Sequence, residues 1–251
     1  MGFNPFIKKP DLMKARRVLC VQAHPDDMDI SLGGTMLALK DRDIPVHYLT
    51  LTDDAAGFSK AGGKYRERAD IRKQEQKEAG EILGVASFHW VDFPDAGEWS
   101  HHEARDAVIR VIRELRPDFL ITLDPFLAYE AHMDHIRTGR AAAEAAMLYN
   151  FPHVAEPLPE GYESFELEGV AFTWTNNPNT VIRTTAYNNR KFEAVSRHAS
   201  QFPGEKDLVL LKKYLTYRAW REALWRPFLL GESLKILPPV MLHCFPEALN
   251  F

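Results

Sequence analysis

Cysteine is scarce in this chain, whose 251 residues contain only Cys20 and Cys244. Two thiols are too few for a disulfide scaffold, and they lack the close spacing of a cysteine-based zinc site. We therefore expect both thiols to be inert and the protein to work in the reducing cytoplasm.

Long apolar runs are missing as well. No stretch reaches the ~18 apolar residues of a membrane-spanning helix, and residues 1–17 contain no apolar segment of signal-peptide length. We therefore expect no membrane association and no secretory signal. The formal net charge of -4 provides no basic surface, so no nucleic-acid partner is expected either.

The glycine-rich phosphate-binding motifs G-x-G-x-x-G and G-x-x-x-x-G-K-[ST] are absent after every predicted strand. Their absence argues against a nucleotide-binding or noncatalytic α/β domain, which is the main competing hypothesis. The composition, with 45% hydrophobic and 26% charged residues, is typical of a globular protein, and the length suits one α/β domain.

Apolar runs alternate with helical patterns through residue 150. This alternation predicts an α/β fold with a mostly parallel sheet covered by helices on both faces. Extra strands and helices follow a proline-rich stretch at 152–169, and after Trp225 we expect an irregular tail that packs on the surface or against a partner. The predicted strands are 16–24, 46–53, 87–93, 118–125, 170–175 and 179–185; the predicted helices are 33–43, 66–83, 102–116, 134–150, 187–200 and 205–224, and a glycine-rich loop covers 54–65.

Polar side chains follow the first predicted strand in the segment AHPDD (23–27). His24 and Asp27 are suitable ligands for a divalent cation, and Pro25 stiffens the turn between them. Adjacent side chains in an extended segment point to opposite sides, so Asp26 can face another part of the same site. Taken alone, the segment also fits a capped strand-to-helix turn with its aspartates near a helix N-terminus.

A second polar segment, AHMDH (131–135), follows the fourth predicted strand. His132 and His135 fit one face of a starting helix, and His135 is a candidate third ligand. Isolated histidine pairs are common and do not by themselves indicate a metal site. In open parallel sheets, however, bound molecules and ions lie beyond the carboxyl ends of the strands, and both polar segments lie there. Three protein ligands with one open position are typical of a catalytic zinc site.

This constellation predicts hydrolysis of an amide. Zinc lowers the pKa of a bound water towards ~7 and polarises a carbonyl group. An unligated Asp26 can accept the proton of the water. A protonated His132 can stabilise the oxyanion or protonate the leaving amine, and Asp134 can orient His132.

Further motifs accompany HPDD, the glycines of GGT and H-x-D-H. They are R-x-x-E-x-x-x-A-x-x-x-LG at 72–84, VDFPD at 91–95, RPDFLITLDP at 116–125 and K-x-x-A-x-x-x-H-x-SQ at 191–201. Over about 16–202, the chain thereby resembles the PIG-L/LmbE-like zinc deacetylases, which remove acetyl groups from N-acetylglucosamine derivatives. The stretch DPFLAYEAHMDH (124–135) looks most like the diacetylchitobiose deacetylase branch.

The resemblance implies a Rossmann-like fold and a single deacetylase domain over 1–251, with a C-terminal helix and tail at 203–251. It implies one zinc ion per chain, a small amino-sugar substrate and a homo-oligomer, either a trimer or a hexamer, for which 152–169 and the tail are candidate interfaces. The residues it implies are His24, Asp27 and His135 as zinc ligands, Asp26 as general base, and His132 as oxyanion-stabilising or acid residue supported by Asp134.

Two departures accompany the resemblance. Met28 stands where relatives usually have glutamate, and Met133 stands where they have proline. Neither change removes a proposed ligand. The first removes a secondary polar contact, and the second loosens the turn before His135.

Four residues are candidate substrate contacts, each with a structural alternative. Phe126 can stack on a sugar ring or pack in the core. Arg72 can bind a substrate hydroxyl or form a surface ion pair. Asp53 can bind sugar hydroxyls or be a solvated turn residue, and His198 can border the site or be an interior histidine. The tryptophans Trp174, Trp220 and Trp225 are expected in the core or at a subunit interface rather than under a sugar.

The sequence therefore predicts a zinc-dependent hydrolase that removes an N-acetyl group from N-acetylglucosamine or diacetylchitobiose. The alternatives that stay open are a deacetylase of glucosaminyl-malate in thiol biosynthesis and a metal hydrolase of another acylated amine. Whether another divalent metal replaces zinc in the cell also stays open.

Overall fold

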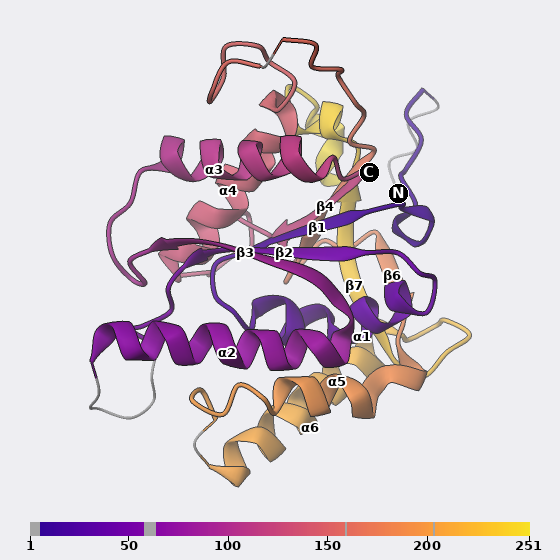
Figure 1. Ribbon diagram of the computed structural model, residues 1–251. Coiled ribbons are helices and arrows are strands. Elements are labelled where there is room, and N and C mark those ends of the chain that lie inside the picture. The colour runs from indigo at the N-terminus through magenta and orange to yellow at the C-terminus, as the bar shows by residue number, and fades with distance from the viewer. Residues whose placement is uncertain (1–5, 58–63, 159, 203) are drawn as a thin grey trace.

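The computed structural model describes residues 6–57, 64–158, 160–202 and 204–251. A seven-stranded sheet crosses its centre (Figure 1). The strands are β1 (Val18–Gln22), β2 (Val46–Thr52), β3 (Val85–Phe93), β4 (Phe119–Leu123), β5 (Gly169–Thr173), β6 (Thr180–Arg183) and β7 (Gly231–Leu237). Their order is β3-β2-β1-β4-β5-β7-β6. The first five strands pair in parallel, and β7 runs antiparallel to both β5 and β6.

Helices cover both faces of this sheet (Figure 1). One face carries α1 (Asp27–Lys40), α2 (Tyr65–Leu83) and α5 (Asn188–Val195), with α6 (Glu205–Glu222) beyond them. The other face carries α3 (His101–Leu115) and α4 (Met133–Leu148), and the 3₁₀ turns η3 (Pro239–Leu242) and η4 (Pro246–Leu249) lie on the same side. The two remaining 3₁₀ turns are η1 (Leu12–Lys14) and η2 (Thr185–Tyr187). The predicted α/β fold with a mostly parallel sheet is confirmed.

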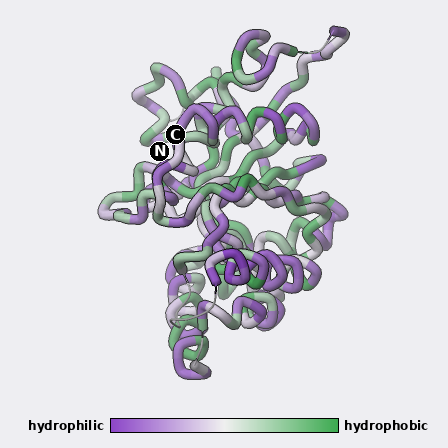
Figure 2. The backbone as a smooth tube through the Cα atoms, turned by 60° about the vertical axis from the view of Figure 1, so that its left-hand side comes forward, coloured by the Kyte–Doolittle hydropathy of each residue, from purple (hydrophilic) through white to green (hydrophobic). Residues whose placement is uncertain are grey.

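The strands are readable in the sequence because β1 is buried on both faces. Val18 and Cys20 belong to the core cluster beneath α1 and α2, whereas Leu19 and Val21 belong to the cluster beneath α3 and α4. A parallel strand buried in this way reads as a continuous apolar run. In Figure 2 hydrophobic residues gather on the central strands, and hydrophilic residues are most frequent on the outer helices.

The strand order locates the candidate site. β2 and β3 lie on one side of β1, and β4 and β5 lie on the other, so the direction of winding reverses between β1 and β4. Ligands of open α/β sheets bind at such a reversal, outside the carboxyl ends of the strands. The segments AHPDD and AHMDH leave β1 and β4 at this place, as the sequence predicts.

Helix α1 begins earlier than the periodicity indicates. The sequence predicts a helix over 33–43, but α1 starts at Asp27 and is kinked at Leu32, where φ is -132° and ψ is 18°. The apolar spacing marks only the part beyond this kink. At Gly34 a β-carbon would lie 2.7 Å from the Thr184 side chain, so glycine permits a close approach of α1 to the end of β6.

The end of helix α2 agrees with the sequence prediction. It ends at Leu83, and Gly84 adopts a left-handed φ of 82°, the conformation that favours glycine after a helix. The loop predicted at 54–65 is irregular over 54–57, and Tyr65 already begins α2. Residues 58–63 of that loop lie outside the described residues.

The tail after Trp225 is predicted to be irregular, and this prediction is wrong for residues 231–237. They form β7, which is buried along its whole length between β5 and β6. The strand could not be predicted from the sequence GESLKIL, because Glu232 and Lys235 are polar residues that are nevertheless buried. Each has its own partners: Glu232 pairs with Lys191 at 2.7 Å, and Lys235 donates to the carbonyl of Leu249.

The end of the tail packs on this chain's own core. Met241 in η3 is buried against α4, and Phe245 and Phe251 contact the same apolar cluster. Contact of the tail with a partner stays a prediction. Within the described ranges, no helix has the length and apolar character needed to cross a membrane.

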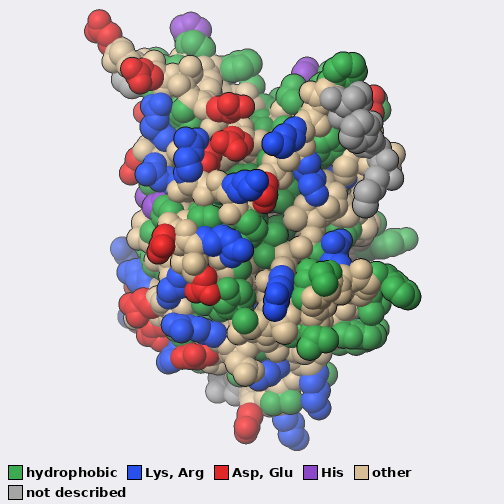
Figure 3. All heavy atoms as spheres, turned by 90° about the vertical axis from the view of Figure 1, so that its right-hand side faces the viewer, with side chains coloured by type: hydrophobic (Ala, Val, Ile, Leu, Met, Phe, Trp, Pro, Cys, Tyr) green, Lys and Arg blue, Asp and Glu red, His purple; other side chains and the backbone are tan. Residues whose placement is uncertain are grey.

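Surface charge on one side of the molecule is mixed. Figure 3 faces the right-hand side of Figure 1, and there Lys and Arg side chains are interspersed with Asp and Glu. Among the described residues on that face, no basic stripe of the kind that binds nucleic acid is visible.

Glu232 provides a test of how β7 is held. Its carboxylate accepts hydrogen bonds from the backbone N–H groups of Gly34 and Thr35 as well as from Lys191. We expect Glu232→Ala to lower the free energy of unfolding by about 3–5 kcal/mol, because Lys191 would remain as a buried, unpaired charge. Urea denaturation measures the change. The control Glu193→Ala removes an exposed carboxylate of α5 and should change stability by about 0.5 kcal/mol at most; equal effects of the two variants would contradict the assignment.

Candidate metal centre

Two polar segments meet at the carboxyl ends of β1 and β4. His24 lies two residues after β1, and Asp27 is the first residue of α1. His132 is the N-cap of α4, and His135 lies in its first turn. Two elements that are more than a hundred residues apart in sequence therefore bring their side chains to one place.

Three ligand-type atoms converge there. Nδ1 of His24 lies 3.2 Å from Nε2 of His135. Oδ1 of Asp27 lies 3.2 Å from the same Nε2, and its Oδ2 lies 3.7 Å from Nδ1 of His24. The three residues satisfy the mutual distances of a metal site. Two ring nitrogens that face each other beside a carboxylate form a set that a divalent cation satisfies.

The Asp27 carboxylate is held by the backbone of the preceding turn. Its Oδ2 accepts hydrogen bonds from the N–H groups of Ala23 and His24, at 3.0 and 2.8 Å. This leaves Oδ1 directed towards His135. The turn that contains Pro25 thus presets one ligand atom before any cation binds.

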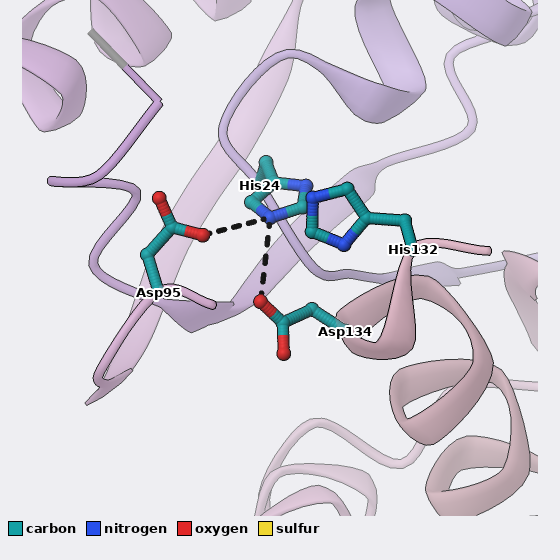
Figure 4. A group of neighbouring side chains, drawn as sticks. All are labelled: His24, Asp95, His132 and Asp134. Atoms are coloured by element: carbon teal, nitrogen blue, oxygen red, sulfur yellow. Dashed lines mark ion pairs between the residues drawn. The ribbon is translucent and has the colours of Figure 1, made fainter. Parts of the chain in front are cut away.

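Carboxylates face the outer ring nitrogens of His24 and His135, and Figure 4 shows those beside His24. Nε2 of His24 is 3.4 Å from Oδ1 of Asp95 and 3.8 Å from Oδ2 of Asp134. Nδ1 of His135 is 3.3 Å from Oε2 of Glu130. Such carboxylates orient metal-binding imidazoles and raise their basicity. Neither Asp95 nor Glu130 was predicted as a site residue, although Asp95 lies in the motif VDFPD and Glu130 in DPFLAYEAHMDH.

His24, Asp95, His132 and Asp134 also satisfy the mutual distances of a metal site. In this second set both oxygens of Asp134 are already engaged, because they accept hydrogen bonds from the backbone N–H of Ala96 and from the indole N–H of Trp99. Asp27, by contrast, keeps Oδ1 directed towards His135. The set of His24, Asp27 and His135 is therefore the better candidate for ligands, with Asp95 and Asp134 as its support.

The charges of the three candidate ligands depend on one another. Burial lowers the pKa of His24, but the nearby Asp27, Asp134 and Asp95 raise it well above the usual value. Burial likewise opposes the effect of Asp27 on His135, whose pKa rises to about 9. Burial also opposes ionisation of Asp27, but His135 and His24 hold its pKa well below the usual range.

Asp26 lies beside this cluster and pairs with Arg72. Its Oδ2 is 3.2 Å from Nη2 of Arg72, and its side chain is 13% exposed. Arg72 is completely buried and also contacts Asp54 and Glu75, at 2.5 and 2.8 Å. Burial raises the pKa of Asp54 to about 7, against the opposing effect of Arg72 and with the help of the Asp26 charge. Three carboxylates thus surround one guanidinium.

This burial corrects the prediction for Arg72. It is neither a surface ion pair nor, in this conformation, a contact for substrate, because no part of its side chain is exposed. Its guanidinium pairs with carboxylates from three different segments, and these pairs stabilise it in the interior. Because α2 contains many charged residues, its sequence does not show which of them is buried.

His198 is likewise an interior residue. Its Nε2 lies 2.8 Å from Oδ2 of Asp29, and both side chains are fully buried. Two residues later, Ser200 donates to Glu75 through its backbone N–H and its hydroxyl, both at 2.7 Å. Of the two alternatives for His198, the structure has the interior one, and the segment packs against the partners of Arg72. A role of His198 towards substrate stays a prediction.

His132 stacks on the ring of His135, with 4.7 Å between centroids. Burial, together with His24 and His135, lowers the pKa of His132. This environment disfavours the protonated form that the sequence analysis expects. Among the contacts of the described residues, Asp134 makes no hydrogen bond to His132, so its orienting role stays a prediction.

Two further candidates have clear positions. Oδ1 of Asp53 accepts hydrogen bonds from the hydroxyl of Tyr65 and the backbone N–H of Asp95, and so shapes the loop that carries Asp95. Phe126 is 64% exposed and lies beneath the guanidinium of Arg140, which excludes the core alternative. Contact of either residue with a sugar stays a prediction.

The two departures from the family motif have different settings. Met28 is fully buried in the core, and its backbone N–H donates to Oε1 of Gln22. An apolar contact thus replaces the polar one expected of a glutamate. Met133 is 51% exposed at the start of α4.

Known proteins resemble this chain over most of its length. The PIG-L family, described as GlcNAc-PI de-N-acetylase, matches residues 19–146, which include all the candidate ligands. A diacetylchitobiose deacetylase of Thermococcus kodakarensis is 35% identical, covering 93% of this chain and 87% of the relative. A probable N-acetyl-alpha-D-glucosaminyl L-malate deacetylase 2 of Bacillus anthracis is 32% identical, covering 74% and 82%. The structure of an N,N'-diacetylchitobiose deacetylase from Pyrococcus horikoshii has a TM-score of 0.81 at 30% identity, covering 93% and 88%.

Glu130 provides a test of the support behind His135. We expect Glu130→Gln to weaken the binding of a divalent cation, for which zinc is the probe, by roughly 10- to 100-fold, because the neutral amide no longer raises the basicity of the His135 ring. Competition with a chromophoric chelator measures the dissociation constant. Glu163→Gln, which changes an exposed loop residue, is the control. A wild-type zinc affinity in Glu130→Gln would remove Glu130 from the site.

Proposed function

The chain belongs to the PIG-L family, and on this premise we propose that it is a zinc-dependent N-deacetylase of a small amino-sugar. Its substrate in this proposal is N-acetylglucosamine or diacetylchitobiose, and each chain holds one zinc ion. The observation that carries the proposal is the convergence of His24, Asp27 and His135 beside Asp26 at the edge of the sheet. The names of the relatives support the choice of an acetylated amino-sugar.

In this proposal His24, Asp27 and His135 hold the zinc ion. When bound at such a site, zinc acidifies a water molecule and polarises a carbonyl group. The preset carboxylate of Asp27 and the carboxylates behind both imidazoles keep the three ligand atoms in place.

Asp26 is the general base of the proposed reaction. Its carboxylate accepts a proton from the attacking water, whose oxygen bonds to the carbonyl carbon of the amide. Arg72 offsets the charge of Asp26 and limits its movement through the contact at 3.2 Å. As the C–N bond breaks, Asp26 returns the proton to the leaving nitrogen, so that acetate and the free amine are the products.

His132 stabilises the negative charge on the carbonyl oxygen. Its environment favours the neutral imidazole, which still donates a hydrogen bond through one ring N–H. Its stacking on His135 holds the ring beside the candidate ligands. Asp134 supports the site through His24 and the loop at Ala96.

A second candidate function is hydrolysis of an N-acetylglucosaminyl malate. The likeness to the malate deacetylase of Bacillus anthracis favours it. The same ligands and base would serve, because the acetamide group that reacts is the same. A cytoplasmic location and a trimeric or hexameric assembly complete the proposal.

Substitution of the base separates chemistry from metal binding. We expect Asp26→Asn to retain about one zinc per chain and to lose roughly 10²–10⁴ in kcat, because an amide cannot accept the proton. Zinc is measured by elemental analysis and activity by amine release. Asp70→Asn, on the exposed side of α2, is the control and should keep full activity. Wild-type turnover by Asp26→Asn would exclude Asp26 as the base.

A screen of amine release decides the substrate. We expect the purified zinc-loaded protein to deacetylate N-acetylglucosamine and diacetylchitobiose, measured with a fluorogenic amine reagent. N-acetylglucosaminyl malate is the third substrate in the screen. Hydrolysis of the malate conjugate alone would favour the second candidate function, and hydrolysis of none of the three would overturn the proposal.

A further inference from the structure

Arg72 reaches Asp26 through one nitrogen of its guanidinium and is fixed through the other two. Nε donates to Asp54 and Nη1 donates to Glu75, at 2.5 and 2.8 Å. Nη2 lies 3.2 Å from Oδ2 of Asp26, but within the described residues it makes no hydrogen bond, so this contact is an ion pair without directional support. The position of Nη2 beside Asp26 therefore depends on the groups that hold Nε and Nη1.

Glu75 is itself fixed by a distant part of the chain. Its Oε1 accepts a hydrogen bond from the backbone N–H of Ser200, and its Oε2 accepts one from the Ser200 hydroxyl, both at 2.7 Å. Glu75 lies in the middle of α2, whereas Ser200 follows the end of α5, 125 positions later in the sequence. Because both carboxylate oxygens are engaged, the Glu75 side chain is held in the orientation in which it contacts Arg72.

The turn that carries Ser200 is anchored in the core by His198. Nε2 of His198 lies 2.8 Å from Oδ2 of Asp29, and Oδ1 of Asp29 accepts a hydrogen bond from the hydroxyl of Tyr48 at 3.0 Å. The side chains of His198, Asp29 and Tyr48 are all fully buried. With Nε2 directed to this carboxylate, Nδ1 of His198 faces Nη1 of Arg72 at 3.5 Å. The anchor thus presents Ser200 to Glu75 in a single position.

Stability alone does not account for this arrangement. One carboxylate would neutralise the guanidinium of Arg72, yet Asp26, Asp54 and Glu75 all contact it, and repulsion among carboxylates opposes folding. Departures from what stability favours are expected at functional sites. What the contacts achieve is a single orientation of the guanidinium, with Nη2 beside Asp26.

We propose that Glu75, with Ser200 and His198 behind it, positions Arg72 so that the guanidinium holds Asp26 in place at the metal centre. The three are positioning residues, which act through Arg72 and do not contact the substrate. This inference rests on the proposed function, because it needs Asp26 to be the general base. It also gives a role to the motif K-x-x-A-x-x-x-H-x-SQ, which the proposed function does not use.

Glu75→Gln tests the first step. With diacetylchitobiose as substrate, we expect kcat to fall roughly 10- to 100-fold, because an amide holds the guanidinium less firmly and the base is displaced. KM and the zinc content should stay at their wild-type values. Glu78→Gln, which changes an exposed carboxylate of the same helix, is the matched control and should keep full activity.

Substitution of Ser200 tests the second step. Ser200→Ala should lower kcat by about 2- to 10-fold, the contribution of one hydrogen bond, again with KM and zinc unchanged. Ser200→Thr keeps a hydroxyl group and should restore most of the lost rate. Wild-type kcat in both Glu75→Gln and Ser200→Ala would overturn the inference, and so would a loss of activity that follows a loss of zinc.

A double-mutant cycle separates positioning from a general effect on the fold. In the Asp26→Asn background, Glu75→Gln should change kcat by less than about 2-fold, because no carboxylate base remains to be positioned. An equal loss in the wild-type and Asp26→Asn backgrounds would show that Glu75 only supports the fold. A circular-dichroism melting curve for each variant ensures that only folded proteins are compared.

A crystal structure of metal-free Glu75→Gln provides a measurement that is independent of activity. We expect Nη2 of Arg72 to move away from Asp26, beyond the 3.2 Å of the wild type. An unchanged guanidinium would overturn the inference while the proposed function stands. If instead the wild-type protein releases no amine from N-acetylglucosamine, diacetylchitobiose or N-acetylglucosaminyl malate, the proposed function fails, whatever the position of Arg72 in the variant.

Discussion

The carboxylate of Asp27 is the contact on which the site depends. One of its oxygens is tied to two backbone N–H groups of the turn after β1, and the other faces His135 at the start of α4. This single side chain therefore joins the end of a strand, the beginning of one helix and the beginning of another. Because both N–H bonds go to one oxygen, the second oxygen stays available for a cation between the two histidines. Asp95, Asp134 and Glu130 then orient the imidazoles of His24 and His135 towards the position that Asp27 defines.

Negative charge is the second constraint on this edge of the sheet. Asp26 and Asp54 both contact Arg72, and Asp27 and Asp95 both contact His24, an accumulation of carboxylates that would be unfavourable without compensating positive charge. The buried guanidinium of Arg72 supplies that charge on one side, and a bound divalent cation would supply it on the other. The division of roles between adjacent aspartates follows from these two neighbours. Asp27 faces the histidines and the backbone, whereas Asp26 faces Arg72 and keeps some exposure to solvent.

Much of the fold could be predicted because its parallel strands are apolar on both faces. β1 and β4 read as apolar runs for this reason, and helix α2 ends before Gly84 as its sequence indicates. β7 was not predicted, because Glu232 and Lys235 are polar residues whose burial depends on partners elsewhere in the chain. Hydrophobic periodicity cannot register a polar residue whose burial depends on a distant neighbour.

By itself, the sequence determined the fold class, the two polar segments at the strand ends and their likeness to a deacetylase family. These are local properties, written in residue type and spacing. Only the tertiary structure decided which side chains meet there. It placed Asp95 and Glu130 behind the histidines, turned Arg72 and His198 inward, and brought Ser200 to Glu75. Such outcomes depend on long-range packing and on the competition of several carboxylates for few positive charges, which no short stretch of sequence encodes.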